Sequence, residues 1–425
     1  MKEKNPYLVP FILMTSLFFF WAFVHNINGT LIPHLRKALL LTDTQSALID
    51  VAIYLAYFLA ALPAGMVIAR RGYRFTIIAG LSLFALGAVL FVPAALSRTY
   101  GVFLLALFVF GFGAAFLETV ANPYISGLGD REHSTSRLNF AQSFNGVGAV
   151  LTPLIGSGLI LSGVTYSDAQ LAAFTPAQLD AYLQGEARSV VLPYLVLAAA
   201  IVAMIVLFVR QPIPEVGGIS GDEGGLPWGS LMRHPRLILA VIAQFFYVGA
   251  QVGVGSFFVR FSQHAAGMSD KQAGFLWGSL AMVGFMLGRF AGTAAMRTVA
   301  PPRLLAIVAV AAAAALTGAI NLTGVPAVAL LMTVPFFMSI MFPTIFDLGI
   351  TGTGSVAKLG SSLIIMAIVG GAVIPVAMGR ISDATHDIQR AFYVPVACFA
   401  VVALFGLYAA RVTSDAPDDA VERAA

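Results

Sequence analysis

Charged residues are scarce in this chain. Asp, Glu, Lys and Arg together make up 10% of its 425 residues, while 59% of the residues are hydrophobic. A soluble domain carries about 25% charged residues, and so few charges cannot cover a surface that faces water. The composition therefore excludes a soluble protein, and lipid must be the solvent for most of the chain.

Cysteine is nearly absent, and with it the patterns of several protein classes. The single cysteine, Cys398, lies in an apolar run and cannot form an internal disulfide. No spacing of Cys, His or acids suits a metal, so we expect neither metal nor cofactor. The net charge of +4 is small, and nothing indicates nucleic acid as a partner. Without a paired nucleophile and base, or a phosphate loop, the chain is not expected to be an enzyme such as a membrane-embedded hydrolase.

Long apolar runs are what the chain has instead. A membrane-spanning helix needs about 20 mostly apolar residues, which predicts an all-α membrane protein. The polar stretch between the fifth and sixth runs, at residues 163–188, is expected to form an outer loop with a surface helix. Twelve runs of this length occur, at residues 8–35, 45–69, 75–96, 102–128, 138–161, 190–209, 237–261, 272–296, 304–322, 325–350, 359–381 and 391–410.

Lys and Arg are distributed unevenly around these spans. With the N-terminus in the cytoplasm, 16 of the 24 Lys and Arg residues fall on the inner side and 8 on the outer side. Loops rich in positive charge stay in the cytoplasm. The sequence therefore predicts a multi-pass protein of the plasma (inner) membrane with both termini cytoplasmic, and the first span is expected to be retained rather than cleaved as a signal peptide.

The two halves of the chain resemble each other. Thr42–Gln45 precedes the second span and Ser269–Gln272 precedes the eighth, and each has the hydroxyl and glutamine of a capping box. The two boxes are 227 residues apart, and the same offset relates Gly65 to Gly292 and Arg70 to Arg297. Two parallel six-helix halves, related by a pseudo-two-fold axis with a site between them, are the arrangement of major facilitator transporters. The predicted parts are a bundle at 1–210, a cytoplasmic linker at 211–232, a second bundle at 233–411 and a disordered tail at 412–425.

The turn between the second and third spans supports this interpretation. Residues 65–74 resemble the major facilitator signature loop, although the usual aspartate is absent and Ala69 takes its place. The alternative is a plain basic turn that obeys the charge rule.

Glu118 is the clearest polar residue within a span. An ionisable group inside the membrane is costly, and it is therefore a functional hypothesis by default. Asn122 lies four residues further on the same helix face, and Pro123 frees a backbone carbonyl there. We interpret Glu118 as a proton-carrying or substrate-binding carboxylate, with a neutral acid bonded to a neighbouring helix as the alternative.

Further polar side chains follow helix faces in other spans. Amides both donate and accept hydrogen bonds, which suits sugar hydroxyls. The alternative role of such residues is to bond one helix to another. The candidates are His25, Asn26 and Asn28 in the first span, Gln142 and Asn145 in the fifth, and Gln244, Tyr247 and Gln251 in the seventh.

Three more charged residues lie within or near span ends. Asp50 in the second span and Asp347 in the tenth are candidates for proton transfer, although Asp50 falls near the predicted outer surface. Arg289 in the eighth span is expected to anchor the inner end of its helix.

Several of these residues carry a family resemblance. Five runs look like the L-fucose/proton symporter family, which also includes bacterial glucose/galactose transporters. The resemblance extends through nearly all spans, and the runs are residues 19–28, 117–124, 137–145, 243–251 and 342–346.

The resemblance implies roles for particular residues. The family's proton-coupling carboxylate matches Glu118, and its sugar-binding asparagines match Asn26 and Asn145. One departure stands out, because Gly29 occupies the position of an aspartate that belongs to the family's proton pathway and sugar site. His25, Asp50 or Asp347 could supply a second titrating group, or Glu118 could act alone.

These observations predict a carrier that imports a monosaccharide by alternating access, coupled to protons and working as a monomer in lipid. Sodium coupling and uniport are alternatives, and so is a nutrient sensor that binds sugar without transporting it. An exporter of drugs would have an apolar cavity without paired amides, which the Gln and Asn sets disfavour.

Overall fold

A computed structural model describes residues 7–22, 39, 43–160, 170, 173–211, 213–216 and 228–414. Within these ranges every regular element is a helix. His25, Asn26, Asn28, Gly29, the 217–227 part of the linker and the tail from 415 lie outside them, as does the side chain of Asp50.

The helices form two compact units. Unit 1 comprises Met1–Ala121 and Val147–Glu215, and unit 2 comprises Asn122–Gly146 and Val216–Ala425. Two helices, α3 (Tyr100–Gly127) and α4 (Ser134–Ile160), therefore contribute to both units. The expected division of the chain at residues 211–232 remains a prediction, since residues 122–146 pack with the second half.

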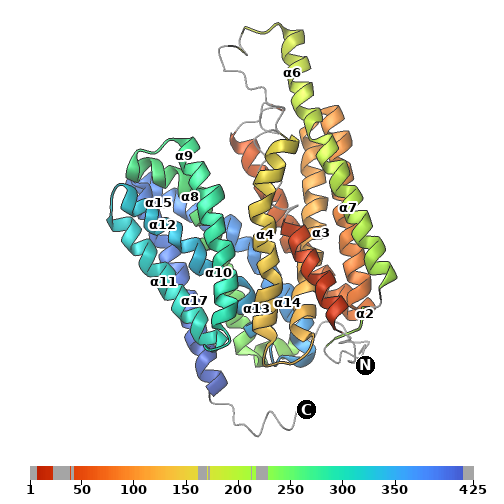
Figure 1. The fold of residues 1–425 in the computed structure, drawn as a ribbon, viewed down its shortest axis with the longest axis vertical. Coiled ribbons are helices and arrows are strands. Elements are labelled where there is room, and N and C mark those ends of the chain that lie inside the picture. Colours follow the sequence, from red (N-terminus) through yellow and green to blue (C-terminus); the bar gives the residue numbers. More distant parts are fainter. Residues whose placement is uncertain are drawn as a thin grey trace. The chain divides into compact units, whose positions relative to one another are not determined.

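Unit 1 contains the first six spans apart from these segments of α3 and α4. Leu8–Ala22 is the described part of the first span, and α2 (Asp43–Ser97) holds the second and third. The surface helix expected in the outer loop is α6 (Pro176–Ser189), which begins with a capping box between Thr175 and Gln178. It leads directly into α7 (Val191–Arg210), which runs alongside α2 (Figure 1).

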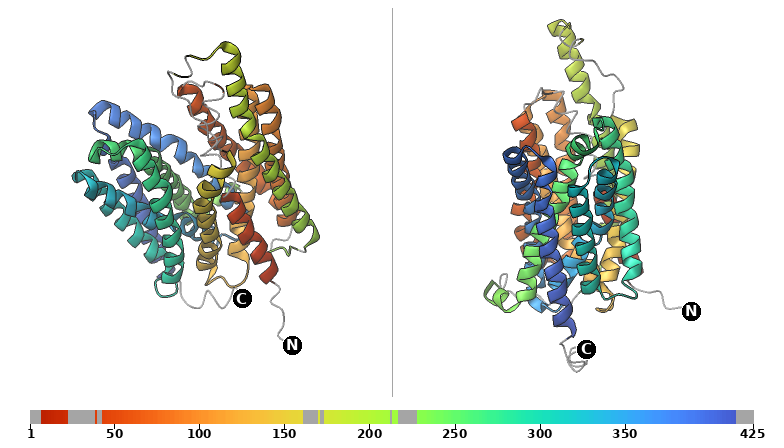
Figure 2. Two further views of the ribbon diagram at one scale, coloured as in Figure 1. Left: turned by 45° about the horizontal axis from the view of Figure 1, so that its top comes forward. Right: turned by 90° about the vertical axis from the view of Figure 1, so that its left-hand side faces the viewer.

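Unit 2 contains the last six spans. The helices α17 and α11 run side by side, and α8 packs against α15 and α17 (Figure 2). The capping box predicted at Ser269 and Gln272 is confirmed. The elements are η1 (Trp228–Arg233), α8 (Pro235–Ala266), α9 (Asp270–Phe275), η2 (Leu276–Ala281), α10 (Met282–Ala295), α11 (Pro301–Asn321), α12 (Val325–Met338), α13 (Met341–Ile350), η3 (Gly354–Val356), α14 (Ala357–Met366), η4 (Ala367–Val369), α15 (Gly370–Thr385), α16 (Ile388–Ala391) and α17 (Tyr393–Ser414).

The predicted twelve-helix architecture is confirmed. Nine helical stretches of the described chain are long and apolar enough to cross a membrane. One of them, Val51–Ser97, contains two of the predicted spans, because Gly72 interrupts α2 with φ 77° and ψ 179°. The helix α4 and the shorter Leu8–Ala22 supply the remaining two.

Three spans of unit 2 are interrupted within the membrane. The eighth passes through the π-helix η2, the tenth breaks between α12 and α13, and the eleventh narrows to the 3-10 turn η4. Irregular backbone at membrane depth is tolerated where protein or a water-filled cavity covers it. At the break in the tenth span, the Met338 carbonyl accepts a hydrogen bond of 3.0 Å from the Tyr247 hydroxyl of α8.

Candidate functional site

In unit 1, Glu118 lies well inside α3 and only 9% of its surface is exposed. The Tyr57 hydroxyl on α2 lies close to the Glu118 carboxyl and to the indole of Trp21. Three spans therefore bring an acid, a phenol and an indole together. We call this group the acid site. Burial disfavours the charged form of a carboxyl group, and hydrogen bonds from polar neighbours favour it.

In unit 2, one face of α4 carries polar side chains that bond to other helices. Ser134, Thr135, Asn139 and Gln142 form this set, which we call the α4 seam. All four are buried or nearly so. Spacings of three, four and seven residues place such side chains along one stripe of a helix. The stripe is polar because its partners on α3, α10 and α13 are polar too.

At the beginning of α4, the seam binds Asp347 of α13. The hydroxyls of Ser134 and Thr135 both donate hydrogen bonds to Asp347 Oδ2, and the Ser134 bond measures 2.8 Å. Asp347 is 1% exposed, and the guanidinium groups of Arg137 and Arg236 lie within electrostatic range of it. An acid at the N-terminus of a helix is also favoured by the helix dipole, so Asp347 is held in place by α4.

One turn further along α4, Asn139 makes a second contact with α13. Its Nδ2 donates to the Thr344 hydroxyl over 3.1 Å and to the Thr135 carbonyl over 2.9 Å. Both Asn139 and Thr344 are fully buried. The two contacts with α13 thus lie one turn apart on each helix.

The third level of the seam joins three side chains. Gln142 Nε2 donates to Asn122 Oδ1 on α3 over 2.7 Å. Arg289 Nη1 on α10 donates to Gln142 Oε1 over 3.1 Å and also to the Gln142 carbonyl. The guanidinium of Arg289 lies 4.8 Å from the centre of the Phe285 ring, a distance typical of a cation–π contact. We call Asn122, Gln142 and Arg289 the amide relay.

The predicted amides of α8 differ in their surroundings. Gln244 and Tyr247 are fully buried, whereas Gln251 is half-buried. Neither polar atom of the Gln244 carboxamide has a hydrogen-bond partner in the described structure. Tyr247 bonds to the break in the tenth span and contacts the Phe342 ring edge to face. A buried amide without a partner is unusual, since such groups are normally paired with protein or water.

The structure brings together some of the predicted site residues. Asn122 and Gln142 bond to each other, and Asn145 lies half-buried on α4. Asp347 lies against α4 rather than beside another acid. The first-span candidates and the side chain of Asp50 lie outside the described residues.

Sequence analysis missed several residues of these groups. Arg289 was expected to be an inner-end anchor, which is wrong, because it is 5% exposed and bonds to α4. The rule that marked Glu118, an ionisable residue within an apolar span, applies equally to Arg289. Tyr57, Ser134, Thr135, Asn139 and Thr344 carry no comparable signal, because hydroxyls and single amides are common in spans.

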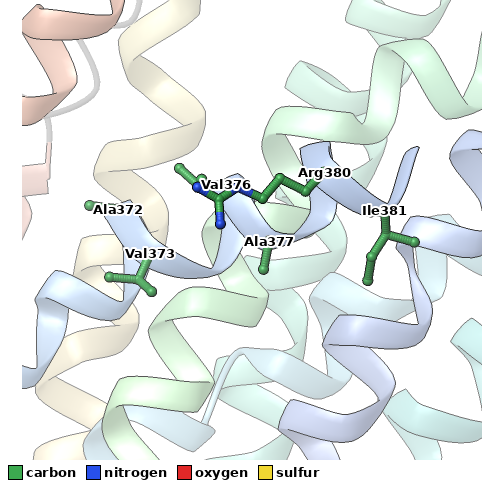
Figure 3. Close-up of a pocket in the computed structure, with 6 residues that line it drawn as sticks. All are labelled: Ala372, Val373, Val376, Ala377, Arg380 and Ile381. Atoms are coloured by element: carbon green, nitrogen blue, oxygen red, sulfur yellow. The ribbon is translucent and has the colours of Figure 1, made fainter. Parts of the chain in front are cut away.

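A separate cavity of about 570 Å³ lies along α15 (Figure 3). Its lining comes from one face of that helix, and Arg380 is the only charged side chain among the lining residues Ala372, Val373, Val376, Ala377, Arg380 and Ile381. None of these belongs to the predicted site. The described residues include no group of three or more His, Cys, Asp or Glu side chains that could hold a metal ion.

Comparisons with known proteins agree with this architecture. Residues 13–357 match the family described as the Major Facilitator Superfamily. The chain is 39% identical to the L-fucose-proton symporter of Escherichia coli K12 over 97% of this chain and 96% of that protein. It is also 39% identical to a glucose/galactose transporter of Brucella abortus over 96% of each chain.

Solved structures give the same result. The crystal structure of the E. coli fucose symporter FucP in the outward conformation matches with a TM-score of 0.88 and 37% identity. The match covers 95% of this chain and 99% of that one.

Proposed function

Because this chain belongs to the major facilitator superfamily, we propose that it imports a monosaccharide together with protons by alternating access. Relatives that match over almost their whole length are named as an L-fucose-proton symporter and as glucose/galactose transporters. The names support a sugar of the hexose or deoxyhexose class as substrate and a proton as the coupling ion.

The observation that carries the proton coupling is the acid site of unit 1. Glu118 is buried in an apolar helix with Tyr57 close to it. In the proposed cycle, Glu118 takes up a proton when the carrier faces outward, and sugar then binds. Reorientation exposes both to the cytoplasm, and loss of the proton resets the carrier. The charged form of a buried carboxylate is disfavoured by desolvation, so reorientation is easier with the neutral acid.

The proposed sugar site uses amides and aromatic groups. Asn26, Asn28, Asn122, Gln142, Asn145, Gln244, Tyr247 and Gln251 remain our candidates for binding hydroxyls. The carboxamide of Gln244 supports this assignment, because its donors and acceptor have no hydrogen-bond partner among the described residues. A sugar hydroxyl, or a water that the sugar displaces, would satisfy both ends of that amide.

Glu118 is the residue that we assign as proton carrier, with His25 and Asp50 as candidates for a second group. Asp347 is a weaker candidate than the sequence suggests. Its Oδ2 accepts hydrogen bonds from two hydroxyls of α4, which supports a structural role for this carboxylate. We propose that Asp347 holds α4 in position.

The distribution of positive charge supports a membrane location and an orientation. We propose that the protein lies in the plasma membrane with both termini in the cytoplasm, as the distribution of Lys and Arg indicates. We expect it to work as a monomer, since each chain supplies all of the proposed groups.

The proposal is tested with purified protein in liposomes. For Glu118→Gln, we expect loss of uphill sugar uptake driven by a proton gradient, while exchange of labelled for unlabelled sugar continues. Ser143→Ala is the control, because the Ser143 hydroxyl is fully buried and bonds within its own helix. Uphill uptake that survives unchanged in Glu118→Gln would show that another group carries the proton.

The same assay separates the alternatives. A sodium gradient that drives uptake without a proton gradient would indicate sodium coupling, and equilibration without accumulation would indicate uniport. Binding of sugar, seen as thermal stabilisation, without any flux would indicate a sensor. A panel of hexoses and deoxyhexoses in the stabilisation assay would identify the substrate.

A further inference from the structure

Arg289 of the eighth span makes polar contacts with α4. It is 5% exposed, and its guanidinium contacts both the Phe285 ring and the Gln142 carboxamide. Tyr247 of α8 lies within electrostatic range of it. Burying a guanidinium costs free energy unless it is hydrogen-bonded. Simple packing would be served as well by an apolar side chain.

Arg289 determines which of the neighbouring groups donate hydrogen bonds and which accept them. A guanidinium has five N–H donors and no acceptor. The atom of Gln142 that faces Arg289 must therefore be the carbonyl oxygen Oε1, which accepts the bond from Nη1. The other end of the Gln142 carboxamide is then an N–H donor.

The orientation of the Gln142 carboxamide in turn determines the orientation of the Asn122 amide. Gln142 Nε2 donates to Asn122 Oδ1, which leaves the Asn122 Nδ2 group as a donor for its remaining contacts. If Arg289 were absent, the Gln142 carboxamide could rotate by half a turn. Its oxygen would then face Asn122 Oδ1, so the Asn122 amide would have to rotate as well. One donor-only residue thus sets the orientation of two amides.

We propose that Arg289 is a positioning residue of the sugar site, because it determines which ends of the Gln142 and Asn122 amides are donors. This inference rests on the proposed function, in which both amides belong to the sugar site. Sugars of one size differ in the directions of their hydroxyls, and a site recognises them by matching donors to acceptors. Inversion of two amides would change this match without changing the size of the site.

The test is the concentration of sugar that gives half-maximal exchange in liposomes. For Arg289→Gln, we expect it to rise by about tenfold or more, because a glutamine can either donate or accept and no longer orients Gln142. Arg289→Lys keeps a donor-only group and should recover part of the loss. A lysine variant no better than the glutamine variant would contradict the proposal.

Gln142→Glu provides a second variant that does not depend on removing Arg289. A carboxylate at residue 142 would pair with Arg289, so the melting temperature should not fall. It could not donate to Asn122 Oδ1, so the half-saturating sugar concentration should still rise by about tenfold. An unchanged half-saturating concentration in Gln142→Glu would overturn the proposal.

Thr293→Val is the matched control. The Thr293 hydroxyl is buried one turn further on α10 and bonds to the Arg289 carbonyl over 2.7 Å, so its loss disturbs the helix but not the amides. We expect a sugar dependence close to that of the unaltered protein. A rise equal to that of Arg289→Gln would mean that Arg289 only supports the helix. If the unaltered protein exchanges no sugar at all, the proposed function fails rather than this inference.

Discussion

Gly72 lies where α2 changes from the second span to the third. Its φ of 77° is a left-handed conformation that side chains rarely adopt. Both carboxylate oxygens of Glu215 accept from the next backbone amide, Tyr73 N, at 3.0 and 3.4 Å. Arg74 donates to the carbonyls of Phe208 and Val209 at the end of α7. Glu215 thus provides an acid at a loop whose usual aspartate is replaced by Ala69.

Replacing this glycine should destabilise unit 1. In Gly72→Ala, the new Cβ would lie 2.3 Å from Glu215 Oε1 and the backbone would be strained. We expect a loss of about 1–3 kcal/mol, measured as a lower melting temperature in detergent. Gly101→Ala is the control, because nothing lies within 4 Å of the added Cβ and alanine favours a helix. Equal melting temperatures for both variants would contradict the strain at Gly72.

At the scale of elements, α4 is the helix that joins the two halves of the sequence. Its seam bonds to α13 at two levels and to α10 at a third. Polar contacts between membrane helices are individually worth about 0.6 kcal/mol on average. A row of such contacts holds helices in register, and modest energies of this size allow the helices to separate during a transport cycle.

The hydrogen bonds between Asp347 and the hydroxyls of Ser134 and Thr135 can be tested by mutation. Asp347→Asn and the double variant Ser134→Ala/Thr135→Ala should each lower stability, and combining them should cost less than the sum. We expect a coupling of about 0.5–3 kcal/mol, measured by unfolding in a double-mutant cycle. Additive losses would mean that the hydroxyls do not bond to Asp347.

Transport distinguishes the two roles proposed for this acid. If Asp347 holds α4, Asp347→Asn should retain uphill uptake driven by protons, in contrast with Glu118→Gln. Loss of uphill uptake with exchange retained would instead establish Asp347 as a second proton carrier.

At the scale of the whole molecule, the charge distribution predicts which loops face the cytoplasm. The only cysteine, Cys398, is 1% exposed, so a cysteine-free variant made by Cys398→Ser is a suitable background. Glu132 after α3 and Ala173 before α6 are both exposed. In intact cells, an impermeant maleimide should label Ala173→Cys but not Glu132→Cys, which should react only after permeabilisation. The opposite pattern would reverse the predicted orientation.

The spans and the family could be predicted from sequence because their signals are local. Apolar runs, charge asymmetry and the capping box at Ser269 each depend on residues that are neighbours in the chain. The predicted span boundaries agree closely with the helices that the structure describes. Glu118 was also found locally, since one acid in an apolar run is conspicuous whatever surrounds it.

The sequence by itself determined a twelve-span helical transporter with Glu118 as an acid within the membrane, because lipid requires hydrophobicity that is visible span by span. Only the tertiary structure decided what the polar groups bond to. The sequence of α4 does not show which helices Gln142 bonds to, and in the structure it bonds to Asn122 and Arg289. Such partners come from α3 and α10, and the rotation and depth at which helices pack are set by many side chains together.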